Sequence, residues 1–233
     1  MKFVSLFSGI GGLDLGLERA GMECVAQVEN DPWCNLVLEK HWPDVPRFGD
    51  IKTLDPKELP DHDLICGGFP CQPVSLAGAR KAQDDERWLW PEYFRIVRQL
   101  RPRYVLVENV PGLASAGMGD VLGDLASVRY DTEWQSISAC AFGSSHSRQR
   151  LFLVAHSTGK RLEGQNGQIR AEVYSRQDHR NLETQREAFR VGPQPSGVAH
   201  GVPSRVDRLR GLGNAVVPQV AEHVGRLILE ASK

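Results

Sequence analysis

The sequence lacks the features that usually mark secreted, zinc-binding and membrane-spanning proteins. Its cysteines number five and include no C-x-x-C pair, which argues against a disulfide framework and against zinc-site spacing. They are Cys24, Cys34, Cys66, Cys71 and Cys140. The chain starts directly with a strand-like segment, and no apolar run is long enough to cross a membrane. We therefore expect a cytoplasmic protein.

An excess of charge of one sign is also missing, so only the distribution of charge can indicate a nucleic-acid partner. The 28 basic and 29 acidic residues give a net charge of -1. The segment from His156 to Arg210, however, contains ten basic and six acidic residues, among many Gly, Gln and Asn residues. This segment suits contacts with phosphates and base edges. The alternative is a solvated or partly disordered insert.

Strand-like and helix-like segments alternate over the first two thirds of the chain. The sequence predicts strands at 3–7, 24–28, 63–66, 103–107 and 150–155. It predicts helices at 13–20, 90–100 and 217–228, the second with Phe94, Val97 and Leu100 on one side. This order favours a parallel α/β sheet wrapped by helices. With 233 residues, of which 41% are hydrophobic, the chain suffices for one large domain with a small insert.

Cys71 lies between two prolines, in Pro70-Cys71-Gln72-Pro73, directly after an apolar run. Proline fixes its own φ and restricts the residue before it, which predicts a stiff turn at the end of a buried strand. Ligands bind at that edge of open parallel sheets, so the pattern favours a nucleophile presented to a substrate. A buried, inert thiol is the alternative.

A glycine-rich turn, Phe7-Ser8-Gly9-Ile10-Gly11-Gly12, follows the first predicted strand and opens a helix. Such a turn lets a cofactor approach the backbone at the helix N-terminus. The strict G-x-G-x-x-G spacing is absent because residue 14 is Asp, which disfavours a nicotinamide-dependent dehydrogenase. Glu29 ends the next strand, where it can accept hydrogen bonds from a ribose diol, and Asp50 can accept from an adenine amino group. A carboxylate at such a position alone is more often solvated surface, but the shared position of the two at strand ends favours a functional role.

Taken together, five motifs resemble those of the DNA (cytosine-5) methyltransferase family and occur in the family order. They are Phe7–Gly12 for the cofactor, Phe69–Ser75 for the nucleophile, Val107-Glu108-Asn109-Val110, Arg148-Gln149-Arg150 and Gly213–Pro218. The resemblance implies a Rossmann-like, S-adenosylmethionine-dependent methyltransferase fold with a mostly parallel sheet, helices on both faces and a small DNA-recognition lobe. The catalytic domain would comprise residues 1–155 and 204–233, and the lobe residues 156–203.

The resemblance also implies the chemistry of the site. Cys71 would add to C6 of a flipped-out cytosine, and Glu108 would hold N3 and the exocyclic amine. Arg148 and Arg150, expected to alternate along the start of a strand, would contact O2 and orient the Cys71 loop. No metal is implied. The implied contacts to S-adenosylmethionine, or to its product S-adenosylhomocysteine, involve Phe7, Gly9, Ile10, Gly12, Glu29, Asn30, Asp50, Ile51, Pro70, Asn214 and Val216.

Two departures from the family pattern bear on substrate choice. Ser145-His146 replaces the usual Pro-Gln pair, and only 62 residues lie between Arg150 and Gly213, where the family carries a larger recognition region. We expect double-stranded DNA as partner, a monomer, and a cognate restriction endonuclease as a functional partner. The alternatives are a tRNA cytosine-5 methyltransferase and a catalytically weak DNA-binding relic.

Overall fold

The computed structural model describes residues 1–70, 88–115, 117–144, 146–157 and 204–233. The strands are β1 (Lys2–Leu6), β2 (Glu23–Val28), β3 (Arg47–Phe48), β4 (Leu64–Gly67), β5 (Tyr104–Asn109), β6 (Tyr130–Ile137) and β7 (Arg150–Ser157). The α-helices are α1 (Gly12–Arg19), α2 (Pro32–His41), α3 (Trp90–Leu100), α4 (Met118–Ser127), α7 (Arg205–Asn214) and α8 (Pro218–Ala231). Short 3₁₀ helices occur at Pro56–Glu58, Pro111–Ser115 and Ala139–Phe142. Across these ranges no helix has the length and apolarity to span a bilayer.

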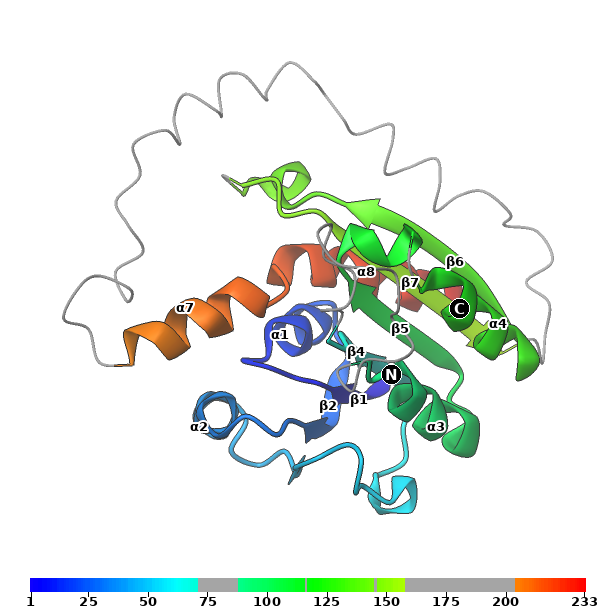
Figure 1. The fold of residues 1–233 in the computed structure, drawn as a ribbon, viewed down its shortest axis with the longest axis horizontal. Helices are drawn as coiled ribbons and strands as arrows, with labels where there is room; N and C mark the ends of the chain where they lie inside the picture. The colour runs from blue at the N-terminus through cyan, green and yellow to red at the C-terminus, as the bar shows by residue number, and fades with distance from the viewer. Residues whose placement is uncertain (71–87, 116, 145, 158–203) are drawn as a thin grey trace.

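The strands form one sheet in the order β3-β2-β1-β4-β5-β7-β6 (Figure 1). β1 to β5 pair in parallel, whereas β7 pairs antiparallel with both β5 and β6. β4 and β5 are buried along their whole length, as expected for parallel strands covered on both faces. The mostly parallel, Rossmann-like fold expected from the sequence is confirmed.

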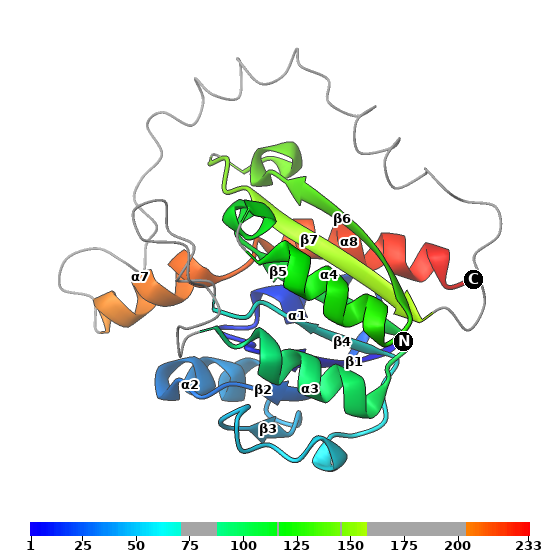
Figure 2. The same ribbon diagram turned by 45° about the vertical axis from the view of Figure 1, so that its right-hand side comes forward.

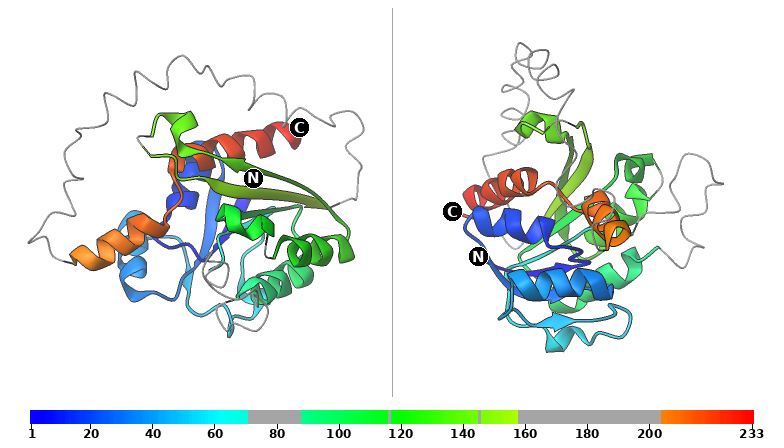
Figure 3. Two further views of the ribbon diagram at one scale, coloured as in Figure 1. Left: turned by 45° about the horizontal axis from the view of Figure 1, so that its top comes forward. Right: turned by 90° about the vertical axis from the view of Figure 1, so that its left-hand side faces the viewer.

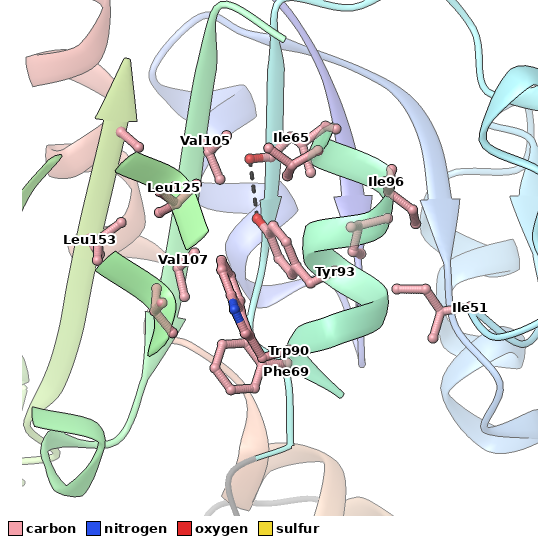
Figure 4. Close-up of a cluster of buried hydrophobic side chains, with 14 of the residues drawn as sticks. Ile51, Ile65, Phe69, Trp90, Tyr93, Ile96, Val105, Val107, Leu125 and Leu153 are labelled. Carbon is pink, nitrogen blue, oxygen red and sulfur yellow. Dashed lines mark hydrogen bonds between the residues drawn. The ribbon is translucent and has the colours of Figure 1, made fainter. Parts of the chain in front are cut away.

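Helices cover the sheet on both faces. α3 and α4 pack on one face, and α1 and α8 pack side by side on the other (Figures 2 and 3). On the α3 face, Trp90 and Tyr93 pack with Phe69 against the strands (Figure 4). The Tyr93 hydroxyl donates to the carbonyls of Ile65 and Leu106, at 3.3 and 3.1 Å, so this buried phenol is satisfied.

The register of the central strands places three chain segments at one edge of the sheet. Leu6 pairs with Gly67, and Gly67 pairs with Val107. The residues that follow each of them therefore leave the sheet at the same edge. Because β7 runs antiparallel to β5, its first residue, Arg150, lies at that edge too. The order of strands reverses between β1 and β4, and this edge is where ligands bind in such sheets.

The helix at 90–100 buries Tyr93, Ile96 and Val97, and Phe94 and Leu100 pack partly buried against the same core. One local expectation needs correction. Arg148 precedes β7 with a left-handed φ of 24°, so it does not alternate with Arg150 along a strand.

Other elements also differ from expectation, and the sequence expectations included no β3, α2 or α4. β7 continues through Ser157, two residues into the expected lobe. The sequence reading missed β6, a half-exposed edge strand, and α7, whose outer face carries exposed apolar side chains. The rest of the expected lobe, 158–203, lies outside the described residues.

Candidate active site

The glycine loop after β1 has a backbone that only small residues tolerate. Gly9 and Gly11 have φ angles of 56° and 80°, in the left-handed region that favours glycine. A Cβ at Gly11 would meet the Trp42 ring at 2.4 Å, and one at Gly12 would meet the Val216 carbonyl oxygen at 2.5 Å. The loop is therefore held between α2 and the segment that precedes α8.

Glu29 anchors this loop to the end of β2. Its two carboxylate oxygens accept hydrogen bonds from the backbone N–H groups of Gly9 and Asp31, both at 2.7 Å. The space where a Cβ of Gly9 would point is open, with no atom of the described residues within 4 Å. Each carboxylate oxygen has a second lone pair, so Glu29 can still accept from a ligand in that space.

The other residues expected to contact the cofactor differ in burial and in their contacts. Phe7 is half-buried and stacks on Tyr93 with ring centroids 6.4 Å apart. Ile51 is buried in the core. Ile10 is half-buried, Val216 is buried, and Asn30, Asp50, Pro70 and Asn214 are exposed. The carboxylate of Asp50 accepts from the Lys52 N–H at 2.9 Å.

Glu108 is a buried carboxyl group at the end of β5. It is 7% exposed, and its Oε1 lies 2.9 Å from Nε of Arg150. Burial raises the pKa of Glu108 to about 7, although the positive charges of Arg150 and Arg148 act in the opposite direction. Near neutral pH this group therefore exists in both protonation states, which suits a residue that holds or releases a proton.

Two residues that the sequence reading did not single out hold the chain that leads to Cys71. A Cβ at Gly68 would lie 2.5 Å from Oε2 of Glu108, so only glycine lets the chain pass this close to the carboxylate. Asn109 donates from Nδ2 to the Phe69 carbonyl at 3.1 Å and accepts from the Val110 N–H. Cys71 itself lies outside the described residues.

Arg148 and Arg150 both act electrostatically on Glu108 but differ in their contacts. Arg150 forms the ion pair with Glu108. Arg148 instead donates from Nη2 to the carbonyls of Gly213 and Ala215, at 2.5 and 2.6 Å. Burial and the neighbouring Arg150 lower the pKa of Arg148.

Asp14 is another residue whose environment the sequence reading missed. It lies in the first turn of α1 and is fully buried. Ser5 Oγ and Gln27 Nε2 donate to its carboxylate at 2.9 and 2.8 Å, and Ser8 Oγ donates to Ser5. This network lies directly behind the glycine loop. Only the mismatch to G-x-G-x-x-G drew attention to this position in the sequence.

The site suits a nucleotide-like cofactor better than a metal ion. Among the described residues, no group of three or more His, Cys, Asp or Glu side chains could hold a metal. The open space at Gly9 and the Glu29 carboxylate fit the amino and ribose groups of S-adenosylmethionine.

The sheet order, the glycine loop after β1 and the acid–arginine pair at the ends of β5 and β7 define a Rossmann-like methyltransferase domain. The chain belongs to the C-5 cytosine-specific DNA methylase family, whose profile matches residues 1–183. This confirms the resemblance seen in the sequence motifs.

Individual relatives agree with this assignment. Type II methyltransferase M.HhaI of Haemophilus parahaemolyticus is 35% identical over 159 residues, which cover 66% of this chain and 48% of the relative. Type II methyltransferase M.AquIA of Picosynechococcus sp. is 34% identical over 187 residues, covering 70% and 74%. The structure of S. pombe Dnmt2 methyltransferase matches with a TM-score of 0.59 at 24% identity, covering 69% and 52%, and shows the fold alone. The chain thus spans about half the length of M.HhaI.

Proposed function

We propose that the protein is a DNA (cytosine-5) methyltransferase, which methylates C5 of a flipped-out cytosine through a covalent bond between Cys71 and C6. The observation that carries the proposal is the buried Glu108, paired with Arg150 and in contact range of the Gly68 backbone that leads to Cys71. Glu108 is a carboxyl group with a raised pKa at the ligand-binding edge of the sheet, where the chain that precedes Cys71 leaves β4, and this supports the proposal.

Glu108 would recognise the cytosine and assist its activation. A protonated carboxyl group donates to N3, and its carbonyl oxygen accepts from the exocyclic amine. As the Cys71 thiolate adds to C6, negative charge develops on the ring, and the proton at N3 neutralises it. A pKa of about 7 lets Glu108 hold that proton at neutral pH.

Cys71 would supply the covalent step. Addition of its thiolate to C6 converts C5 into an enamine carbon that can act as a nucleophile. When bound, S-adenosylmethionine supplies the electrophilic methyl group. Loss of the C5 proton then expels the thiolate and leaves 5-methylcytosine, so that the enzyme is regenerated.

The glycine loop, Glu29 and the backbone around Val216 would hold S-adenosylmethionine. Glu29 already orients Gly9, beside which the space is open, and its carboxylate oxygens have further lone pairs that can accept from the cofactor. The Phe7 ring lies at the same edge, half-buried against Tyr93. Asn30, Asp50, Pro70 and Asn214 are exposed around this edge and remain proposed contacts.

The DNA would be read by the basic segment within 156–203, with its arginines on phosphates. The target base cannot be reached inside the duplex, so it must be flipped out, which costs a few kcal/mol. We further propose a monomer acting together with a cognate restriction endonuclease, as the family resemblance implies.

Bisulfite sequencing of DNA from cells that express the chain tests this function. We expect 5-methylcytosine at a short recurrent sequence, and none with Cys71→Ser. Purified protein should transfer labelled methyl groups to duplex DNA. Transfer to total tRNA instead would establish the tRNA methyltransferase, and the absence of transfer to either, with cofactor binding intact, would establish a relic.

A further inference from the structure

The side chain of Arg148 reaches across the molecule to the end of α7. Its Nη2 donates to the carbonyls of Gly213 and Ala215, which are 65 and 67 residues away in the sequence. The last carbonyls of a helix lack partners within the helix and carry the negative end of its dipole. The last turn of α7 contains no basic residue of its own. Arg148 therefore supplies both the missing donor and the missing positive charge.

The segment that Arg148 holds rests directly on the glycine loop. The backbone N and O of Val216 lie 3.1 and 2.5 Å from where a Cβ of Gly12 would be. At the other side of the same segment, Gly211 packs on Ile10 and on the Trp33 ring. A Cβ at Gly211 would lie 3.0 Å from Ile10 and 2.6 Å from the Trp33 ring. A shift of residues 211–216 would therefore change the shape of the loop from both sides.

A second interaction, an ion pair, holds α7 near the end of β2. Arg210 forms an ion pair with Asp31, whose backbone N–H is held by Glu29. Arg210 thus holds α7 to Asp31, the residue before α2, and Arg148 holds the end of α7. Of these two arginines, only Arg148 lies in the R-x-R motif that also contains Arg150.

The two arginines of the R-x-R motif therefore have different partners. Arg150 directs its Nε to the Glu108 carboxylate, in the pocket proposed for the base. Arg148 donates from Nη2 to backbone carbonyls of the C-terminal segment. Arg148 precedes β7 and has a left-handed φ of 24°.

We propose that Arg148 is a positioning residue for the S-adenosylmethionine site: it caps α7, keeps Val216 against Gly12 and thereby shapes the glycine loop. This assignment rests on the proposed function. Within the R-x-R motif, Arg150 then serves the pocket for the base, and Arg148 serves the site for the cofactor. It replaces the expectation that both arginines contact the cytosine.

The test compares Arg148→Met with Arg150→Met, and Arg148→Lys keeps the charge if the methionine variant folds poorly. Isothermal titration with S-adenosylhomocysteine should show Kd about tenfold higher for Arg148→Met, as expected for loss of charge-assisted hydrogen bonds. Arg148→Lys should restore part of this loss, and Arg150→Met should bind like the wild type. In turnover, Arg148→Met should raise KM for S-adenosylmethionine, whereas Arg150→Met should lower kcat.

A measurement on the protein without ligand separates this inference from the proposed function. The Ala215 N–H donates to Gly211 in the last turn of α7, so hydrogen exchange reports on the cap. Exchange at Ala215 should be faster in Arg148→Met than in Arg150→Met. Unchanged exchange and unchanged Kd would overturn the role of Arg148. Faster exchange in a protein that binds no S-adenosylhomocysteine would overturn the cofactor site, and with it the assigned role.

Discussion

Replacement of Asp14 by asparagine should change how the stability of the protein depends on pH. Asp14 is fully buried, and burial raises its pKa from 3.8 to about 6, outweighing the hydrogen bonds from Gln27 and Ser5. The nearby Glu18 acts in the same direction as burial. The thiols of Cys24 and Cys66 also face this carboxylate from β2 and β4.

The sign of the effect follows from proton linkage. A carboxyl group whose pKa is raised by folding stabilises the protein fully when protonated, below about pH 4. This contribution is lost as the pH rises through about 6. A change from 3.8 to about 6 corresponds to about 3 kcal/mol in total, of which about 2 kcal/mol falls between pH 4.5 and pH 8.

Asparagine has no charge to lose, and it can still accept from Gln27. The free energy of unfolding of Asp14→Asn minus that of the wild type should therefore increase by about 2 kcal/mol from pH 4.5 to pH 8. Urea denaturation at several pH values measures this difference, in which the titration of other carboxylates cancels. Asp44→Asn, at an exposed position, is the control. A difference that stays constant or decreases with pH would refute the assignment of a raised pKa to Asp14.

Three further changes test the site. Gly68→Ala should displace the Glu108 carboxylate, because the alanine Cβ would lie 2.5 Å from Oε2 of Glu108. Steady-state kinetics should then show a large fall in kcat, with little change in the affinity for S-adenosylhomocysteine. Glu108→Gln should lower the methylation rate by about 100-fold, equivalent to about 3 kcal/mol, while filter binding shows nearly unchanged affinity for DNA. An equal loss of rate and affinity would make Glu108 a structural residue. Exchange of residues 157–203 with those of a relative that methylates another sequence should transfer the relative's site in bisulfite sequencing; an active chimera that keeps the original site would place recognition in the large domain.

The sequence predicted the parallel part of the fold because buried parallel strands are continuous apolar runs, as in Leu64–Gly67. It missed β6 because an edge strand that is half exposed has no such run, and Trp134 on it is 50% exposed. α7 was missed because its apolar side chains are exposed and its sequence is rich in arginine. These elements are specified by tertiary contacts more than by local pattern.

The family resemblance implied one site for Glu108 and the two arginines; in the structure Arg150 pairs with Glu108, and the charges of both arginines act to lower the pKa of Glu108. The different partners of Arg148 and Arg150 could not be predicted, since the contact of Arg148 with Gly213 spans 65 residues. Asp14 was similarly hidden, because an acidic residue in the first turn of a helix is ordinarily an exposed one. Its burial depends on Ser5 and Gln27, which come from two neighbouring strands.

The most direct test of the central claim is covalent trapping by duplex DNA in which the target cytosine is replaced by 5-fluorocytosine. Fluorine cannot leave C5 as a proton does, so the bond between Cys71 and C6 should persist. We expect a denaturation-resistant protein–DNA adduct with the wild-type chain and S-adenosylmethionine, and none with Cys71→Ser. The account would be contradicted by the absence of an adduct at a site that the wild type methylates, or by robust turnover of the serine variant.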